Sequence, residues 1–215
     1  MLSFKATDDL LLYGSYSRGY KAGGFNLDRS ALNPANPRVQ DLEFEPEKVN
    51  AFEVGAKYDG RTIDVNVALF WQEFDQFQLN TFNGLSFLVE NIQACSDDLG
   101  TPPPGLVFGG CTGDVEAGVR SRGIEVEVFS RPIDNVQLNA GLTYADTKFR
   151  DQLVGDASGA PLNQALRKLP GQQLSLAPEI VVTTSAAWTP DLGSSGLSAL
   201  FYVDSRLSGD YNTGS

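Results

Sequence analysis

Residues 62–71 read TIDVNVALFW, and the spacing of the side chains in this stretch decides the fold. Apolar residues occupy alternate positions: Ile63, Val65, Val67, Leu69 and Trp71. Alternation with a period of two is typical of a β-strand with one apolar face, because successive side chains point to opposite faces of a sheet. The stretch therefore predicts one strand of a sheet whose two faces meet different surroundings.

Similar patterns, some of them less regular, mark six further segments, so the sequence predicts about seven strands and an all-β fold. The strands are expected at residues 10–20, 51–58, 62–71, 122–128, 135–145, 177–188 and 197–206. Convincing amphipathic helices are scarce. No apolar run approaches the roughly 20 residues that a membrane-spanning helix needs.

The connections between these strands alternate in length. Long segments are expected at residues 21–46, 80–114 and 146–176, and short turns at YDGR, RPIDN and TPDLGSSG. In an up-and-down meander every long segment then falls at the same end of the sheet. Loops longer than about 15 residues are uncommon in compact domains. Outer-membrane barrels, by contrast, pair long extracellular loops with short periplasmic turns. We therefore expect part of an antiparallel up-and-down transmembrane β-barrel.

The polar positions of the strands fit this interpretation. Glu53, Lys57, Glu125 and Glu127 alternate with apolar neighbours, and in a membrane barrel they would face a hydrated lumen. A small self-contained barrel or sandwich with a structural or adhesive role gives the same alternation with the faces reversed. Periodicity alone does not separate these two alternatives.

Composition argues against several classes of function. The chain has 16 Lys and Arg against 27 Asp and Glu, a formal net charge of −11. Nucleic-acid-binding proteins carry a basic footprint instead, so no nucleic-acid partner is expected. The chain contains no histidine, which removes the usual general base. We expect no enzyme, no cofactor and no metal site, since two cysteines fall short of the four ligands of structural zinc.

Four motifs in series resemble the barrel of TonB-dependent outer-membrane receptors. They are YGSYSRGYKAGGFN at 13–26, FEPEKVNAFEVGAKYDGR at 44–61, VNVALFWQEFDQFQ at 65–78 and SRGIEVEVFSRP at 121–132. The resemblance implies a location in the bacterial outer membrane and a barrel of 22 strands closed by an N-terminal plug. It also implies active uptake of a ferric siderophore or a similar large nutrient. The implied partners are the TonB complex, that nutrient and outer-membrane lipid.

Within the architecture of this family, residues 1–215 are expected to form part of one barrel domain. The sequence shows no recognisable plug domain, signal peptide or closing strands. About seven strands would leave two unpaired sheet edges, which lipid does not tolerate. We therefore expect this portion not to transport by itself.

The resemblance places the long connections outside the cell, where recognition commonly sits on loops held by a rigid scaffold. Exposure to the oxidising periplasm predicts a disulfide between Cys95 and Cys111 that stiffens the second long connection. The candidates for ligand contact are Phe25, Asn26, Phe82, Phe87 and Phe108. The alternative for each aromatic ring is that it packs the loops against one another.

Overall fold

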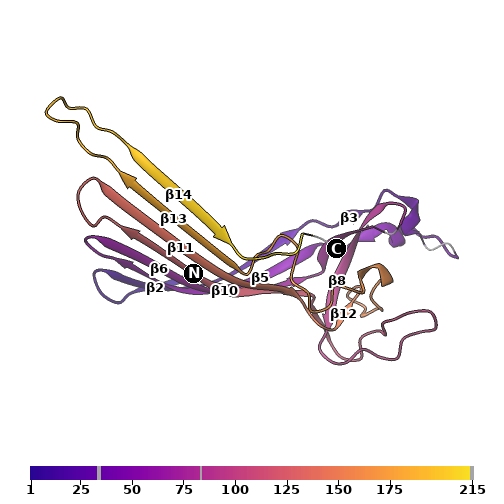
Figure 1. Cartoon of the computed structure of the whole chain (residues 1–215). Coiled ribbons are helices and arrows are strands. Elements are labelled where there is room, and N and C mark those ends of the chain that lie inside the picture. The colour runs from indigo at the N-terminus through magenta and orange to yellow at the C-terminus, as the bar shows by residue number, and fades with distance from the viewer. Residues whose placement is uncertain (33–34, 83, 214–215) are drawn as a thin grey trace.

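The main element of the computed structural model, which describes residues 1–32, 35–82 and 84–213, is an antiparallel sheet. This main sheet has eight strands in the order β1-β2-β5-β6-β10-β11-β13-β14. Their bounds are Leu2–Lys5, Leu10–Lys21, Glu47–Asp59, Ile63–Asp75, Val119–Ser130, Val136–Phe149, Ile180–Trp188 and Phe201–Ser208. Strands that follow one another along the sheet lie side by side (Figure 1), so the predicted up-and-down meander is confirmed.

The structure contains strands that the sequence patterns did not predict. Strand β1 has only four residues, too few for alternation to show. The segment expected to be a loop at 80–114 begins inside a hairpin formed by β7 (Phe77–Phe82) and β8 (Phe87–Cys95). Short strands β9 (Val115–Ala117) and β12 (Leu153–Val154) pair with β8.

The remaining elements are small. Strand β3 (Gly24–Phe25) pairs with β4 (Glu43–Phe44) in a two-stranded ribbon. The described residues include three 3-10 turns: η1 (Arg29–Ala31), η2 (Val39–Leu42) and η3 (Gln164–Leu166). Within the described ranges, no helix has the length and apolar character to cross a bilayer.

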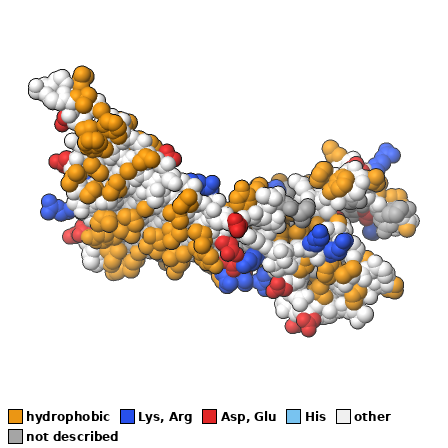
Figure 2. Space-filling model, in the orientation of Figure 1, with side chains coloured by type: hydrophobic (Ala, Val, Ile, Leu, Met, Phe, Trp, Pro, Cys, Tyr) orange, Lys and Arg blue, Asp and Glu red, His pale blue; other side chains and the backbone are white. Residues whose placement is uncertain are grey.

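The register of the main sheet lines up apolar side chains across all eight strands. One such row consists of Phe4, Leu12, Ala56, Val67, Val126, Leu142, Val182 and Leu207. Many side chains on this face stay exposed, with Val54 at 56% and Leu207 at 67%. Figure 2 shows hydrophobic side chains spread over the strand region. Exposed apolar surface on this scale is typical of a face that meets a non-aqueous partner.

The opposite face of the main sheet is polar. One row on it runs through Lys57, Asn66 and Glu127, and Asn66 Nδ2 donates to Glu127 Oε2 at 3.4 Å. Glu53 and Glu125 lie on the same face, four positions along β5 from Lys57 and two positions along β10 from Glu127 respectively. The four ionisable residues singled out in the sequence thus share one face. That this face lines a lumen stays a prediction.

Aromatic residues border the apolar face at both ends of the strands. Towards the long connections, Tyr16, Phe52 and Trp71 form a row, and the rings of Tyr16 and Phe52 lie 4.9 Å apart. At the short-turn end the rings of Trp188 and Phe201 stack at 5.3 Å. Two aromatic borders around an apolar band are typical of strands that cross a bilayer.

The apolar face supplies a direct test. We expect Val67→Arg to destabilise the intact protein by about 2–4 kcal/mol in a bilayer, because a cation would face hydrocarbon. Asn66→Arg is the matched control, since its side chain would lie beside Glu127 on the polar face. Urea unfolding in lipid vesicles measures both. Equal destabilisation by the two variants would contradict the assignment of the faces.

Candidate functional site

The three long connections of the main sheet gather at one end of it (Figure 1). We call the described parts of residues 22–46, 76–118 and 150–179 the loop cluster. The β7–β8 hairpin belongs to the second connection, and β8 also pairs with β12 from the third. The loop cluster is therefore a structured body, not a set of separate loops.

A conventional hydrophobic core holds the loop cluster together. The largest fully buried side chains among the described residues are Ile92, Leu153, Leu162, Val119 and Val154. Phe149 joins this core at the end of β11, where its ring meets that of Phe77 edge-on with centroids 6.1 Å apart. Each fully buried aliphatic side chain contributes about 1.5–3 kcal/mol. The core therefore gives the loop cluster a rigid base.

Asn26 fastens the first connection to the hairpin. Its Nδ2 donates to the carbonyl oxygen of Val89 at 2.9 Å, and the Val89 backbone N–H donates to its Oδ1 at 2.7 Å. One carboxamide thus satisfies both backbone groups of a strand residue, as a neighbouring strand would. Asn26 was predicted as a ligand contact, and the structure assigns its amide to this clamp.

Two further carboxamides of the hairpin also bind backbone groups of the first connection. Asn91 Oδ1 accepts from the Glu45 backbone N–H at 2.7 Å, and its Nδ2 donates to the Glu45 carbonyl at 3.1 Å. Gln78 Nε2 donates to the carbonyl oxygens of Ala22 and Glu45 at 2.9 and 3.0 Å. Both side chains are buried, where an unpaired amide would cost about 1–3 kcal/mol. The first connection is therefore fixed along its contact with β7 and β8.

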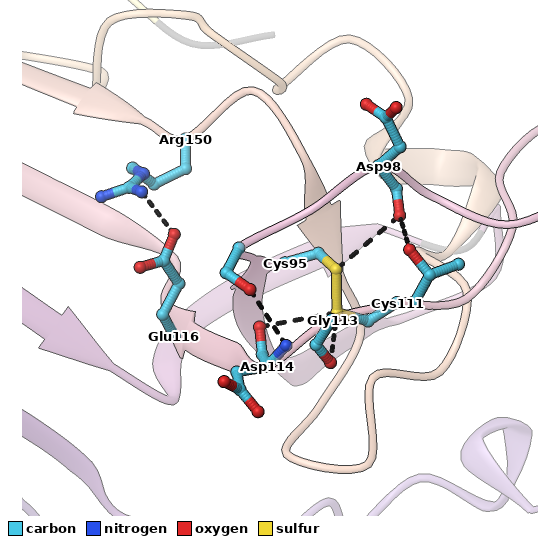
Figure 3. Close-up of a disulfide and its surroundings, with 9 residues drawn as sticks. Cys95, Asp98, Cys111, Gly113, Asp114, Glu116 and Arg150 are labelled. Carbon is cyan, nitrogen blue, oxygen red and sulfur yellow. Dashed lines mark hydrogen bonds and ion pairs between the residues drawn. A yellow bond between two sulfur atoms is a disulfide. The ribbon is translucent and has the colours of Figure 1, made fainter.

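The disulfide between Cys95 and Cys111 is present, as predicted (Figure 3). Both cysteines also donate backbone hydrogen bonds to the third connection, Cys95 to the Gln152 carbonyl and Cys111 to the Gly159 carbonyl, each at 2.8 Å. Nearby, Arg150 forms an ion pair with Glu116 (Figure 3). The disulfide therefore lies where the second and third connections meet, a position suited to stiffening.

Asp28 anchors the turn η1. Its Oδ1 accepts from the Ser30 backbone N–H at 2.7 Å. Hydrogen bonds from the Ser30 side chain and backbone hold the pKa of this exposed carboxyl below its usual value. Ser30 Oγ lies 2.8 Å from Ser86 Oγ near the hairpin tip, so the turn is attached to the second connection.

A cavity of about 460 Å³ lies between the three connections along β8. Its carboxylates are Asp41, Glu43, Glu90 and Asp156, and no lysine or arginine is among its described lining residues. Asn163 Nδ2 donates to Glu90 Oε1 at 2.6 Å and so joins the third connection to the hairpin. A cleft lined by charges of one sign focuses the local field, so this acidic cavity attracts cationic groups.

The predicted contact residues take different positions. Phe82 and Phe87 are 53% and 73% exposed and form a ring pair with centroids 5.1 Å apart. Phe25 is also exposed, while Phe108 packs against the hydrophobic core, as its alternative interpretation had it. Ligand contact by these residues stays a prediction. The sequence analysis did not predict a structural role for Gln78 and Asn91. Their only sign in the sequence is a carboxamide at a strand position that faces inward in the hairpin.

A continuous antiparallel meander, an apolar face with aromatic borders and a loop cluster at one end define a segment of a membrane β-barrel. A model of the family described as TonB dependent receptor-like, beta-barrel, matches residues 1–215. The chain belongs to this family of outer-membrane receptors. Such receptors transport nutrients and are not enzymes, in agreement with the prediction.

Solved structures share the fold. The ferric yersiniabactin uptake receptor FyuA from Yersinia pestis is 16% identical with a TM-score of 0.63, over 96% of this chain and 24% of that one. BauA, the ferric preacinetobactin receptor from Acinetobacter baumannii, is 21% identical with a TM-score of 0.52, over 89% and 22%. The copper transporter OprC is 12% identical with a TM-score of 0.53, over 86% and 23%. The chain thus spans about a quarter of the length of these proteins.

The Asn26 clamp is expected to control local opening of the hairpin. Asn26→Ala leaves the Val89 backbone groups without their partner, at a cost of about 1–3 kcal/mol. We expect amide hydrogen exchange at Val89 to accelerate roughly tenfold or more for that reason. Asn80→Ala on the same hairpin is the control, because that exposed carboxamide makes no hydrogen bond to the described residues. Unchanged exchange at Val89 in the Asn26 variant would rule out the clamp.

Removal of the disulfide should loosen the loop cluster and leave the main sheet in place. The double variant Cys95→Ala, Cys111→Ala loses a cross-link across 16 positions, worth about 3 kcal/mol in the chain-entropy model. We expect new protease cleavage within residues 96–110 of the intact protein. The difference in gel migration between unheated and heated samples, which reports a folded barrel, should be unchanged. Loss of that migration would show that the main sheet depends on the bridge.

Proposed function

We propose that this chain supplies part of the barrel and outer loops of a receptor that takes up a ferric siderophore or a similar large nutrient. The observation that supports this most is family membership over residues 1–215. Similar folds in receptors for ferric yersiniabactin and ferric preacinetobactin favour an iron complex as the cargo.

In this proposal the main sheet is an arc of a larger barrel in the bacterial outer membrane. Its outer strands β1 and β14 each pair with one neighbour within the described residues. Backbone groups in hydrocarbon need partners, so further strands of the intact receptor would pair with both edges. A plug inside the barrel would couple transport to the TonB complex.

The two faces of the main sheet would then have different roles. The apolar face contacts outer-membrane lipid, and the polar face with Glu53, Lys57, Glu125 and Glu127 lines the hydrated lumen. The loop cluster, fixed by its core, its carboxamides and the disulfide, captures the ligand at the outer mouth. No covalent bond forms in this process.

This portion of the receptor offers few donor atoms for bare copper, despite the fold shared with a copper transporter. Copper sites use thiolate, thioether and imidazole ligands. The chain has no histidine and one methionine, and both cysteines are joined in the disulfide. A siderophore brings its own iron ligands, so its receptor needs surface complementarity instead.

Uptake by cells tests the proposal. Iron-limited bacteria that lack their own receptors would express the intact protein and receive radiolabelled iron bound to catecholate, hydroxamate or phenolate siderophores. We expect accumulation of at least one complex, abolished in a strain without TonB. That strain also expresses the receptor, so any iron it retains measures binding to the cell surface without transport. Absence of uptake for all complexes, together with cell adhesion, would instead support the structural or adhesive alternative.

A further inference from the structure

A second cavity lies along β7, and we propose that it binds an anionic ligand that carries a planar ring. The inference rests on the proposed function, since a nutrient meets the outer cavities of its receptor first. Aromatic and cationic side chains line the cavity, together with a buried hydroxyl group that has no partner.

The cavity has a size suited to a small organic ligand. Its volume is about 480 Å³, within the range of about 300–1,000 Å³ typical of ligand pockets. The β7–β8 hairpin forms one side, and residues 165–169, which begin within η3, form another. Phe149 also lines the cavity, and alternation along β11 places it on the polar face of the main sheet. The cavity therefore lies at the end of the face expected to line the lumen.

One wall offers an aromatic surface. Phe82 and Phe87 are cross-strand partners at the hairpin tip, and both rings line the cavity while remaining more than half exposed. Leu79 extends the apolar surface along β7. Paired exposed rings offer a planar ligand offset or edge-on contacts that bury their apolar faces. A ring-bearing ligand is therefore a better fit to this wall than a flexible chain.

Another wall is cationic. Arg167 and Lys168 line the cavity, both are exposed, and neither has an ion pair within the described residues. No carboxylate is among the described lining residues, in a chain with 27 acidic residues. The cavity along β8 has the opposite character, with four carboxylates. A guanidinium and an ammonium group on one wall favour a carboxylate or another oxyanion.

Thr81 supplies the most specific feature. Its side chain is only 5% exposed, it lines the cavity, and its Oγ1 has no hydrogen-bond partner among the described residues. A buried hydroxyl without a partner is destabilising unless something satisfies it. Its Oγ1 exposes almost no surface, so rotation of the side chain about χ1 would present this hydroxyl to an oxygen of an anion bound in the cavity.

The test uses the intact receptor in detergent and three small ligands: naphthoate, its neutral isostere naphthamide, and octanoate, an anion without a ring. We expect naphthoate to bind most tightly, by roughly tenfold over each of the other two, in equilibrium dialysis. Equal affinity for naphthoate and naphthamide would overturn the anionic part of the proposal. Equal affinity for naphthoate and octanoate would overturn the aromatic part.

Variants then locate the site. Arg167→Gln combined with Lys168→Gln should weaken naphthoate roughly tenfold and leave naphthamide unchanged. Arg61→Gln, which removes an exposed cation at a short turn, should change neither. Thr81→Val keeps the side-chain volume and should weaken naphthoate by a few-fold, whereas a purely structural threonine would leave affinity unchanged. Unchanged naphthoate affinity in the double variant would overturn the proposal.

The experiments distinguish failure of the proposed anion site from failure of the proposed transport function. Naphthoate selectivity without uptake of any ferric complex would retain the anion site and reject the transport role. Uptake that is equally fast in the wild type and the Arg167, Lys168 double variant, with equal naphthoate binding, would retain transport and reject the site. The wild-type comparison of three ligands stands even if a variant fails to fold.

Discussion

The continuous antiparallel ladder from β1 to β14 is the interaction on which the rest of the structure depends. Hydrocarbon offers no hydrogen bonds, so backbone groups within it must pair with one another. The pairs within the main sheet keep a single register from end to end. A slip by one residue would move every side chain of a strand to the opposite face. The apolar band and the polar face are thus consequences of one register.

Two kinds of stabilisation act in different parts of the chain. The main sheet leaves both faces open, and its fully buried residues lie only where it joins the loop cluster. Its cohesion comes from the ladder and, in the proposed setting, from lipid. The loop cluster instead has a hydrophobic core, buried carboxamides and a disulfide, as a small water-soluble domain does. The shape of the loop cluster therefore does not depend on the membrane.

The sequence predicted what depends on local pattern. Alternation in TIDVNVALFW indicated a strand, and two cysteines in a segment assigned to an oxidising compartment indicated their disulfide. The β7–β8 hairpin was not predicted, although its two strands are adjacent in sequence, because the buried polar residues Gln78, Asn91 and Gln93 interrupt the apolar alternation. Asn26 is 63 positions from Val89 and Asn91 is 46 from Glu45, and no local signal reveals such pairs. Loop position alone suggested ligand contact for Asn26, although its amide serves the scaffold.

The acidic and the cationic cavity described above give the loop cluster an electrical polarity. Leu166 lines both, so the acidic cavity along β8 and the cationic cavity along β7 are close neighbours. An approaching molecule with separated charges experiences a torque in such a field before it makes any contact. In the proposed receptor this torque would turn the anionic end towards β7 and the cationic end towards β8. This alignment weakens as ionic strength rises, because the field is screened over about 8 Å at physiological salt.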